Sequence, residues 1–346
     1  MKVADAGEFG LIERLCGLVP LSAPGLAVPV GDDAAVIRAG QGEDLLATCD
    51  MLVEGVHFLR DRTPARLLGR KAAAVNVSDV AAMGGWPAYL FVSLAVPGDL
   101  DMAWADGLYK GLGDAARRFG FALAGGNVSR NPDRVVVDLF LLGKVEQGRA
   151  LLRSGARPGD RVLVTGTLGD SAAGLALLDQ PRANVPALTW KKLVAAHQDP
   201  MPRLAEGRAL CAWGKVTAAL DVSDGLLADL SHLCERSRVG ARVRSDRVPI
   251  SSRARKAAKA LGRDPLEWAL SGGEDYELLF TVPLDRVEEA IELLSSPGLA
   301  TAVEIGEILG PGQGVMVEDE RGNPVKTGAP GGWDHFRSPA GKKGKP

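Results

Sequence analysis

The stretch "RSGARPGD", residues 153–160, divides the chain into two halves that follow the same pattern. It is polar and rich in glycine and proline, which is typical of a turn or linker. Short apolar strand patterns alternate with helical patterns before it, and the alternation restarts after it with "RVLVTG" (161–166). Such alternation predicts an α/β or α+β fold. We place the boundary between two domains near residues 147–152.

A chain of 346 residues has room for two domains, each with its own core. We expect an N-terminal domain over residues 1–147 and a C-terminal domain over residues 148–337. The last nine residues, "SPAGKKGKP" (338–346), have few apolar side chains and are expected to be disordered.

Several elements of the N-terminal half are predicted with their ends. The segment "TPARLLGRKAAAVNVSDVAAMGG" (63–85) is expected to be a helix that Thr63 caps and the final glycine pair stops. "EFGLIERLCGLV" (8–19) has helical spacing. "DLLATCD" (44–50) is expected to be a strand ending at Asp50, and "FALAGGN" (121–127) a strand that meets a glycine pair.

The composition excludes several classes of function. The net charge is −2, so no basic excess points to nucleic acid or to an anionic membrane. No apolar run approaches the ~20 residues of a membrane span, and charges interrupt the apolar residues at the N-terminus. The four cysteines form no C-x-x-C pair, which fits a reducing compartment. We therefore expect a soluble cytoplasmic protein that binds neither nucleic acid nor membrane.

Adjacent carboxylates in "VGDDAAVI" (30–37) raise the first question about function. At ~4 Å and an effective dielectric constant of about 20, two such charges repel each other by roughly 4 kcal/mol. Since neighbouring side chains of a strand point to opposite faces, only one of Asp32 and Asp33 is expected to face a given site.

Further acidic residues stand at expected strand ends, in glycine turns or inside a helix. They are Asp50, Asp79, Asp221, Asp224, Glu274 and Asp275. A single Asp is more often a cap or a turn residue, and Asp224 could cap a helix that starts at Gly225. Together, short carboxylates on rigid supports are the ligands that Mg²⁺ requires, and Mg²⁺ would offset their repulsion.

Clustered magnesium ligands indicate phosphate chemistry. The chain has no G-x-x-x-x-G-K-[ST] sequence and no protein-kinase motif set, so a P-loop enzyme and a protein kinase are excluded. The glycine pair Gly125–Gly126 would allow a ligand to approach the backbone, although a plain turn explains it equally well. His57, in "EGVHF", could contact a phosphate, although a lone histidine more often has a structural role.

Seven segments in this order resemble the thiamine-monophosphate kinase family. They are "GDDAAV", "DMLVEGVHF", "KAAAVNVSDVAAMGG", "VTGTLGDSAAGL", "DVSDGLLADL", "SGGEDYELLF" and "GWDHF", and they span about residues 7–337. The resemblance implies two α/β domains of the aminoimidazole ribonucleotide synthetase superfamily, with the N-terminal domains pairing in a homodimer. It also implies transfer of the γ-phosphoryl group of ATP to thiamine phosphate, with several Mg²⁺ ions.

The resemblance also implies roles for individual residues. The magnesium ligands would be Asp33, Thr48, Cys49, Asp50, Asp79, Asn127, Asp221 and Asp224. The residues facing ATP would be Tyr109, Gly125, Gly126, Arg153 and Ser223, and those facing thiamine phosphate would be His57, Glu274 and Trp333. Two positions depart from the family: Asn127 stands where Asp is common, and Cys49 where Thr is usual. An amide brings no charge and a thiol is a poor ligand for Mg²⁺, so we expect the metals near them to bind more weakly and Cys49 to contribute through its carbonyl.

Other functions remain open from the residues. A selenophosphate synthetase would need a reactive Cys or Lys in an N-terminal glycine-rich loop, and a hydrogenase-maturation dehydratase a C-terminal cysteine; the chain has neither. A non-catalytic sensor of thiamine phosphate or nucleotide is the alternative outside catalysis, with Asn127 as its support. For the kinase we expect direct in-line transfer without a catalytic base, because the acceptor is already an oxyanion.

Overall fold

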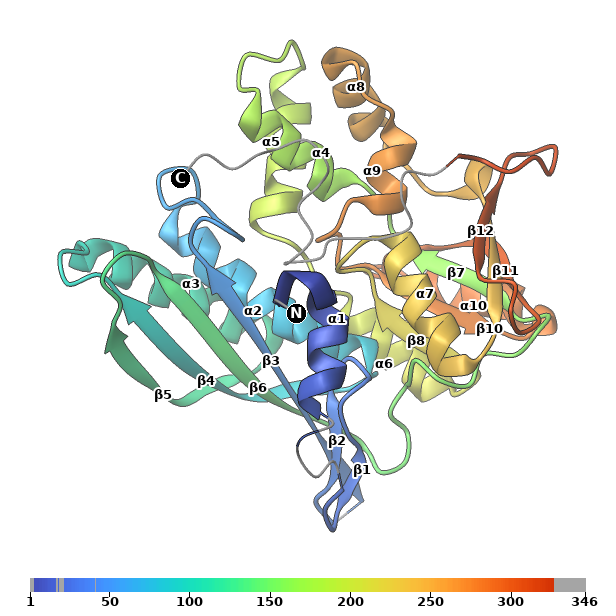
Figure 1. Ribbon diagram of the computed structural model, residues 1–346, viewed down its shortest axis with the longest axis horizontal. Coiled ribbons are helices and arrows are strands. Elements are labelled where there is room, and N and C mark those ends of the chain that lie inside the picture. Colours follow the sequence, from blue (N-terminus) through green and yellow to red (C-terminus); the bar gives the residue numbers. More distant parts are fainter. Residues whose placement is uncertain (1–2, 17, 19–21, 41, 327–346) are drawn as a thin grey trace.

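A computed structural model describes residues 3–16, 18, 22–40 and 42–326. It consists of two six-stranded sheets with helices packed against them (Figure 1). Most strand pairs are antiparallel, and the crossovers and helices make the architecture a mixed α and β one, as expected. Among the described residues, no helix is long and apolar enough to cross a membrane.

The first sheet comes from the N-terminal half and has the order β1-β2-β3-β6-β4-β5. Its strands are β1 (Leu26–Val28), β2 (Ala35–Arg38), β3 (Glu43–Val53), β4 (Trp86–Val96), β5 (Ala122–Arg130) and β6 (Val136–Glu146). The long strands β3 and β6 pair without a break from Glu43↔Glu146 to Val53↔Val136. Within the described part of this sheet, β4 and β5 form the one parallel pair. Helix α1 (Val3–Cys16) precedes the sheet.

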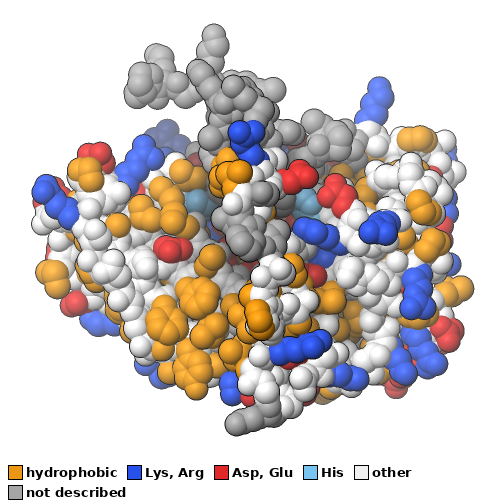
Figure 2. Space-filling view, turned by 60° about the horizontal axis from the view of Figure 1, so that its bottom comes forward, with side chains coloured by type: hydrophobic (Ala, Val, Ile, Leu, Met, Phe, Trp, Pro, Cys, Tyr) orange, Lys and Arg blue, Asp and Glu red, His pale blue; other side chains and the backbone are white. Residues whose placement is uncertain are grey.

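Residues of the first sheet alternate between a buried and an exposed face. On β4, Leu90, Val92 and Leu94 are buried, whereas Tyr89 and Phe91 are exposed. The buried face packs against α2 (Ala65–Ala82), which in turn packs against α3 (Met102–Phe119). Figure 2 shows apolar side chains gathered over the exposed face.

The second sheet comes from the C-terminal half and has the order β12-β9-β11-β7-β10-β8. Its strands are β7 (Arg161–Thr165), β8 (Ala218–Asp221), β9 (Gly240–Arg244), β10 (Leu278–Val282), β11 (Ala302–Leu309) and β12 (Val315–Glu318). The helices of this half are α4 (Asp170–Asp179), α5 (Ala187–Gln198), α6 (Leu204–Trp213), α7 (Leu226–Ser237), α8 (Ser252–Leu261), α9 (Pro265–Ser271) and α10 (Val287–Leu294).

Helix α2 lies between the two halves. Its carbonyl at Ala81 comes so close to α6 that a Cβ at Gly207 would lie 2.0 Å from it, so only glycine fits there. A hydrophobic cluster extends across this contact, since Val80 and Leu46 belong to it together with Leu210 and Phe280. The two halves therefore share a core through α2.

Several expected boundaries were wrong. Helix α2 starts at Ala65 with Pro64 as its N-cap, so Thr63 lies one position before the cap and no side chain of the cap residue bonds to the helix. Strand β3 continues past Asp50 to Val53, since β6 offers a pairing partner along its whole length. Strand β5 continues through the glycine pair to Arg130, because Gly125 and Gly126 pair with β4. The tail 338–346 lies outside the described residues.

Candidate active site

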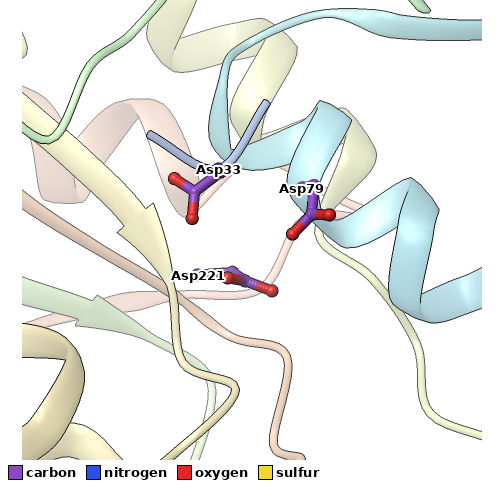
Figure 3. A group of neighbouring side chains, drawn as sticks. All are labelled: Asp33, Asp79 and Asp221. Atoms are coloured by element: carbon purple, nitrogen blue, oxygen red, sulfur yellow. The ribbon is translucent and has the colours of Figure 1, made fainter. Parts of the chain in front are cut away.

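Three carboxylates from distant parts of the sequence come together between the two sheets. One oxygen each of Asp33, Asp79 and Asp221 lies within 4.8 Å of the others (Figure 3). Asp33 comes from the loop between β1 and β2, Asp79 from the last turns of α2, and Asp221 from the end of β8. Both halves of the chain therefore contribute to one acidic group, which we call the carboxylate group.

Hydroxyl donors hold two members of the carboxylate group in place. Thr48 Oγ1 on β3 donates to Oδ2 of Asp79 at 2.5 Å. Ser78 Oγ, on α2, donates to Oδ2 of Asp221 at 2.5 Å across the contact between the halves. Since each bond links two elements, the position of the carboxylates depends on how α2 packs against β3 and β8.

The electrostatics of the carboxylate group and of the neighbouring Asp50 favour a bound cation. Burial raises the pKa of Asp50 to about 6, and burial with repulsion from Asp33 raises the pKa of Asp221 to about 7. Burial and then Asp50, Asp221 and Asp33 raise the pKa of Asp79 well above its usual value. The Oδ2 atoms of Asp33 and Asp50 are buried and accept no hydrogen bond from the described residues. Orphaned carboxylate oxygens with raised pKa values are the environment that a divalent cation fits.

Arg153 holds both members of the aspartate pair. Its backbone N–H donates to Asp32 at 3.0 Å, and its guanidinium donates to Oδ1 of Asp33 at 2.6 Å. The two aspartates lie in a loop, not on a strand, so the reason given for their divergence was wrong. Their divergence itself is present, since Asp33 joins the carboxylate group and Asp32 binds the backbone of the linker.

The segment after β8 forms a tight turn in front of α7. Asp229, inside α7, accepts hydrogen bonds from the backbone N–H groups of Asp224 (3.1 Å) and Gly225 (3.0 Å). Asp229 therefore holds the backbone just before the helix, and the N-cap residue of α7 is Gly225, one position after Asp224. The carbonyl of Ser223 accepts a bond from the N–H of Glu274 at 2.7 Å.

Glu274 lies in a glycine turn that closes over this segment. The Lys71 ammonium lies 2.5 Å from its Oε1 and His197 Nδ1 lies 3.1 Å from its Oε2. Although burial acts in the opposite direction, Lys71 and then His197 lower the pKa of Glu274 to about 2. Sequence reasoning missed Lys71 and His197; the one signal was a lysine inside the apolar run of a helix.

The remaining predicted residues lie further out on the first sheet and its helices. Cys49 is exposed on the opposite face of β3 from Thr48, and Asn127 lies on the edge strand β5 beside Ser93 of β4. His57 Nδ1 accepts a bond from the N–H of Val53 at 3.0 Å. Tyr109 is partly exposed on α3. Trp333 lies outside the described residues.

Asp138, which sequence reasoning also missed, shares the exposed face of the first sheet with Phe140. It pairs with Met51 of β3 and Ser93 of β4. Its charge contributes to the raised pKa values of Asp50 and Cys49, after burial in both cases. Asp138 and the uncharged Asn127 thus lie on either side of Ser93 of β4, two strands apart.

Two family models cover most of the chain. The model described as "AIR synthase related protein, N-terminal domain" matches residues 31–145, and the one described as "AIR synthase related protein, C-terminal domain" matches residues 157–318. The thiamine-monophosphate kinase of Escherichia coli strain K12 is 40% identical over 337 residues, which cover 96% of this chain and 99% of the relative. The chain belongs to the thiamine-monophosphate kinase family.

Other members of the thiamine-monophosphate kinase family are similar to this chain in sequence and in structure. The relative from Aquifex aeolicus is 36% identical over 336 residues, covering 97% of this chain and all of the relative (100%). A solved structure described as "AaThiL complexed with AMPPCP and TMP" superposes with a TM-score of 0.84 at 37% identity, covering 97% of this chain and 99% of that one. The thiamine-monophosphate kinase of Stenotrophomonas maltophilia has a TM-score of 0.74 at 38% identity, over 92% and 98% of the two chains. Hydrogenase maturation protein HypE, at 19–23% identity, shares the fold alone.

Proposed function

We propose that the protein transfers the γ-phosphoryl group of ATP to thiamine phosphate and releases thiamine diphosphate and ADP. The observation that carries the proposal is the 40% identity with a thiamine-monophosphate kinase over nearly the whole chain. The four cysteines Cys16, Cys49, Cys211 and Cys234 are free, which supports placing the reaction in the reducing cytoplasm.

The carboxylate group fits Mg²⁺ by its chemistry. We propose Asp33, Asp50, Asp79, Asp221 and Asp224 as carboxylate ligands, because hard cations prefer such oxygens. The Oδ2 atoms of Asp33 and Asp50 are buried and have no hydrogen-bond partner among the described residues. Thr48 and Asn127 would add neutral oxygens, and Cys49 its backbone carbonyl. Bound there, Mg²⁺ would neutralise charge on the phosphates during transfer.

The two substrates are proposed to meet at the contact between the halves. We assign Tyr109, Gly125, Gly126, Arg153 and Ser223 to ATP, and His57, Glu274 and Trp333 to thiamine phosphate. Of these, Arg153, Ser223 and Glu274 lie at that contact, whereas Tyr109, the glycine pair and His57 lie further out on the N-terminal half. Thr48 and Ser78 keep the carboxylates oriented, and Arg153 holds Asp33. Since the attacking group is an ionised phosphate oxygen, these residues need only position the reactants and no side chain has to remove a proton.

The purified protein is expected to form thiamine diphosphate from ATP, Mg²⁺ and thiamine phosphate, detected by chromatography. No label should remain on the protein when γ-labelled ATP is supplied without an acceptor, because direct transfer needs no protein nucleophile. Binding of both compounds without product would favour the sensor function. Stable label that is lost when thiamine phosphate is added would show a two-step mechanism.

We further propose that the exposed face of the first sheet pairs with the same face of a second copy. Tyr89, Phe91 and Phe140 are 48%, 36% and 40% exposed there, and the rings of Phe91 and Phe140 lie 6.1 Å apart. An apolar surface of this kind on a soluble protein typically marks an interface. A β-sheet face is also flat enough to match itself across a twofold axis.

Phe140→Glu is expected to convert the dimer to a monomer, because it replaces an aromatic ring of this face with a second carboxylate on β6, next to Asp138 on the same face. Light scattering after size-exclusion chromatography measures the mass directly. Leu188→Glu, at a side chain of α5 that is 68% exposed, is the control and should leave the mass unchanged. A monomeric wild-type protein, or a Phe140→Glu variant that stays dimeric, would refute the assignment of this face.

A further inference from the structure

Lys71 is a buried cation to which the proposed reaction assigns no role. Its side chain is 3% exposed, because it belongs to α2, which lies between the two halves. Lysine is almost never fully buried unless it is paired, because the charged form loses its hydration. Its partner is Glu274, with 2.5 Å between Nζ and Oε1. The pair joins the N-terminal half to a loop of the C-terminal half.

The other carboxylate oxygen of Glu274 is held by a different helix. His197 Nδ1, near the end of α5, lies 3.1 Å from Oε2 and also 3.2 Å from Ser171 Oγ on α4. The His197 side chain is 10% exposed, so water competes little for this contact. Each oxygen of Glu274 thus has its own partner, one from each half of the chain.

The backbone of Glu274 is fixed as well. Its φ of 65° is in the left-handed region that side chains disfavour, and its N–H donates to the carbonyl of Ser223 at 2.7 Å. A Cβ at Gly273 would lie 2.4 Å from that carbonyl, so the turn requires glycine before Glu274. A disfavoured conformation that the surroundings hold in place is typical of functional sites.

We propose that Lys71 and His197 are positioning residues that hold the Glu274 carboxylate in one orientation toward the acceptor substrate. The inference rests on the proposed role of Glu274 in binding thiamine phosphate. An ionised carboxylate can accept about four hydrogen bonds, so sites remain for donors of the substrate. Because Lys71 balances its charge, Glu274 would act as a hydrogen-bond acceptor and not as a counter-ion.

The test compares Lys71→Met with Arg70→Met in the full-length protein. Arg70 Nη2 lies 2.5 Å from Asp199 Oδ2, so this neighbouring residue of α2 also forms an ion pair to the end of α5, but it does not touch Glu274. Lys71→Met is expected to raise KM for thiamine phosphate about tenfold, which corresponds to 1.4 kcal/mol, with KM for ATP within about twofold. Arg70→Met should leave both KM values unchanged.

Two further sets of variants separate positioning from a general loss of structure. In a Glu274→Gln background, Lys71→Met should change KM for thiamine phosphate by less than about twofold, because residues that act through one group are not additive. His197→Asn, whose amide can donate in place of Nδ1, should retain more affinity than His197→Ala. The histidine variants also provide the test if Lys71→Met does not fold.

Three results would overturn the inference: an unchanged KM for thiamine phosphate in Lys71→Met, equal effects of Lys71→Met and Arg70→Met, or full additivity with Glu274→Gln. If the wild-type protein forms thiamine diphosphate, any of these refutes the positioning role alone. If the wild-type protein forms none, the proposed function fails and the inference fails with it.

Discussion

Asp79→Ala is expected to remove more than nine-tenths of kcat while the protein stays folded. Asp79 lies between Thr48 of β3 and the carboxylates Asp33 and Asp221, so it is the member through which the two halves share one site. A tenfold loss corresponds to about 1.4 kcal/mol of transition-state stabilisation, a modest demand on a group that would hold metal. Asp50→Ala should behave in the same way, because the Asp50 carboxylate interacts directly with that of Asp79.

The matched control is Asp44→Ala on the same strand as Asp50. Asp44 is 3% exposed and accepts a bond from the N–H of Gly148 at 2.9 Å, away from the carboxylate group. Its loss should lower the melting temperature and leave kcat nearly unchanged. Asp79→Ala should lower kcat and leave the protein folded. If Asp79→Ala or Asp50→Ala retains more than a tenth of wild-type kcat, the residue that was replaced is not a metal ligand.

The metal-free protein is expected to become less stable as pH rises from 4 to 7. The pKa values of Asp50 and Asp221 are raised to about 6 and about 7 by burial, and in Asp221 also by Asp33. In the unfolded chain these groups release their protons near pH 4, so the folded state binds more protons between pH 4 and 7. Stability must then fall through this window and level off above it.

Mg²⁺ with a non-hydrolysable ATP analogue should reverse this trend. Mg²⁺ binds the ionised carboxylates of the folded state and carries the nucleotide with it. At pH 8 the melting temperature is therefore expected to rise by about 5–10 °C. At pH 5.5 the rise should be smaller, because protons compete with the cation. Differential scanning calorimetry at the two pH values measures both effects, and Asp79→Asn is the control that should weaken them. Equal shifts at both pH values would contradict a carboxylate site.

The sequence predicted the individual acidic residues better than their supports. Asp33, Asp79 and Asp221 stand out because carboxylates are unusual among apolar neighbours, and the structure brings them together. Lys71 and His197 could not be found in this way, since their partner lies on a loop about 200 and 80 residues away and only the packing of α2 against α5 creates the contact.

Local patterns also failed where they were weak. Helix α8 was not anticipated because its buried side chains are Ala254, Ala257 and Ala258, and alanines among charged residues produce little apolar periodicity. The cap of α2 was assigned to Thr63 because Ser and Thr are the usual caps, whereas the N-cap is Pro64, whose side chain makes no bond to the helix.

Helix α2, which both halves cover, has a consequence for how the chain acquires and keeps its structure. The halves have separate sheets, and one hydrophobic cluster joins them, since Leu163 and Phe280 from one and Val80 and Leu141 from the other belong to it. A second cluster lies wholly in the C-terminal half. Separating the two halves at the linker would expose Lys71 and Ser78 of α2, which are both buried in the intact molecule, to solvent. Chimeras between relatives are therefore expected to keep their packing only when α2 is exchanged together with the helices and strands that surround it.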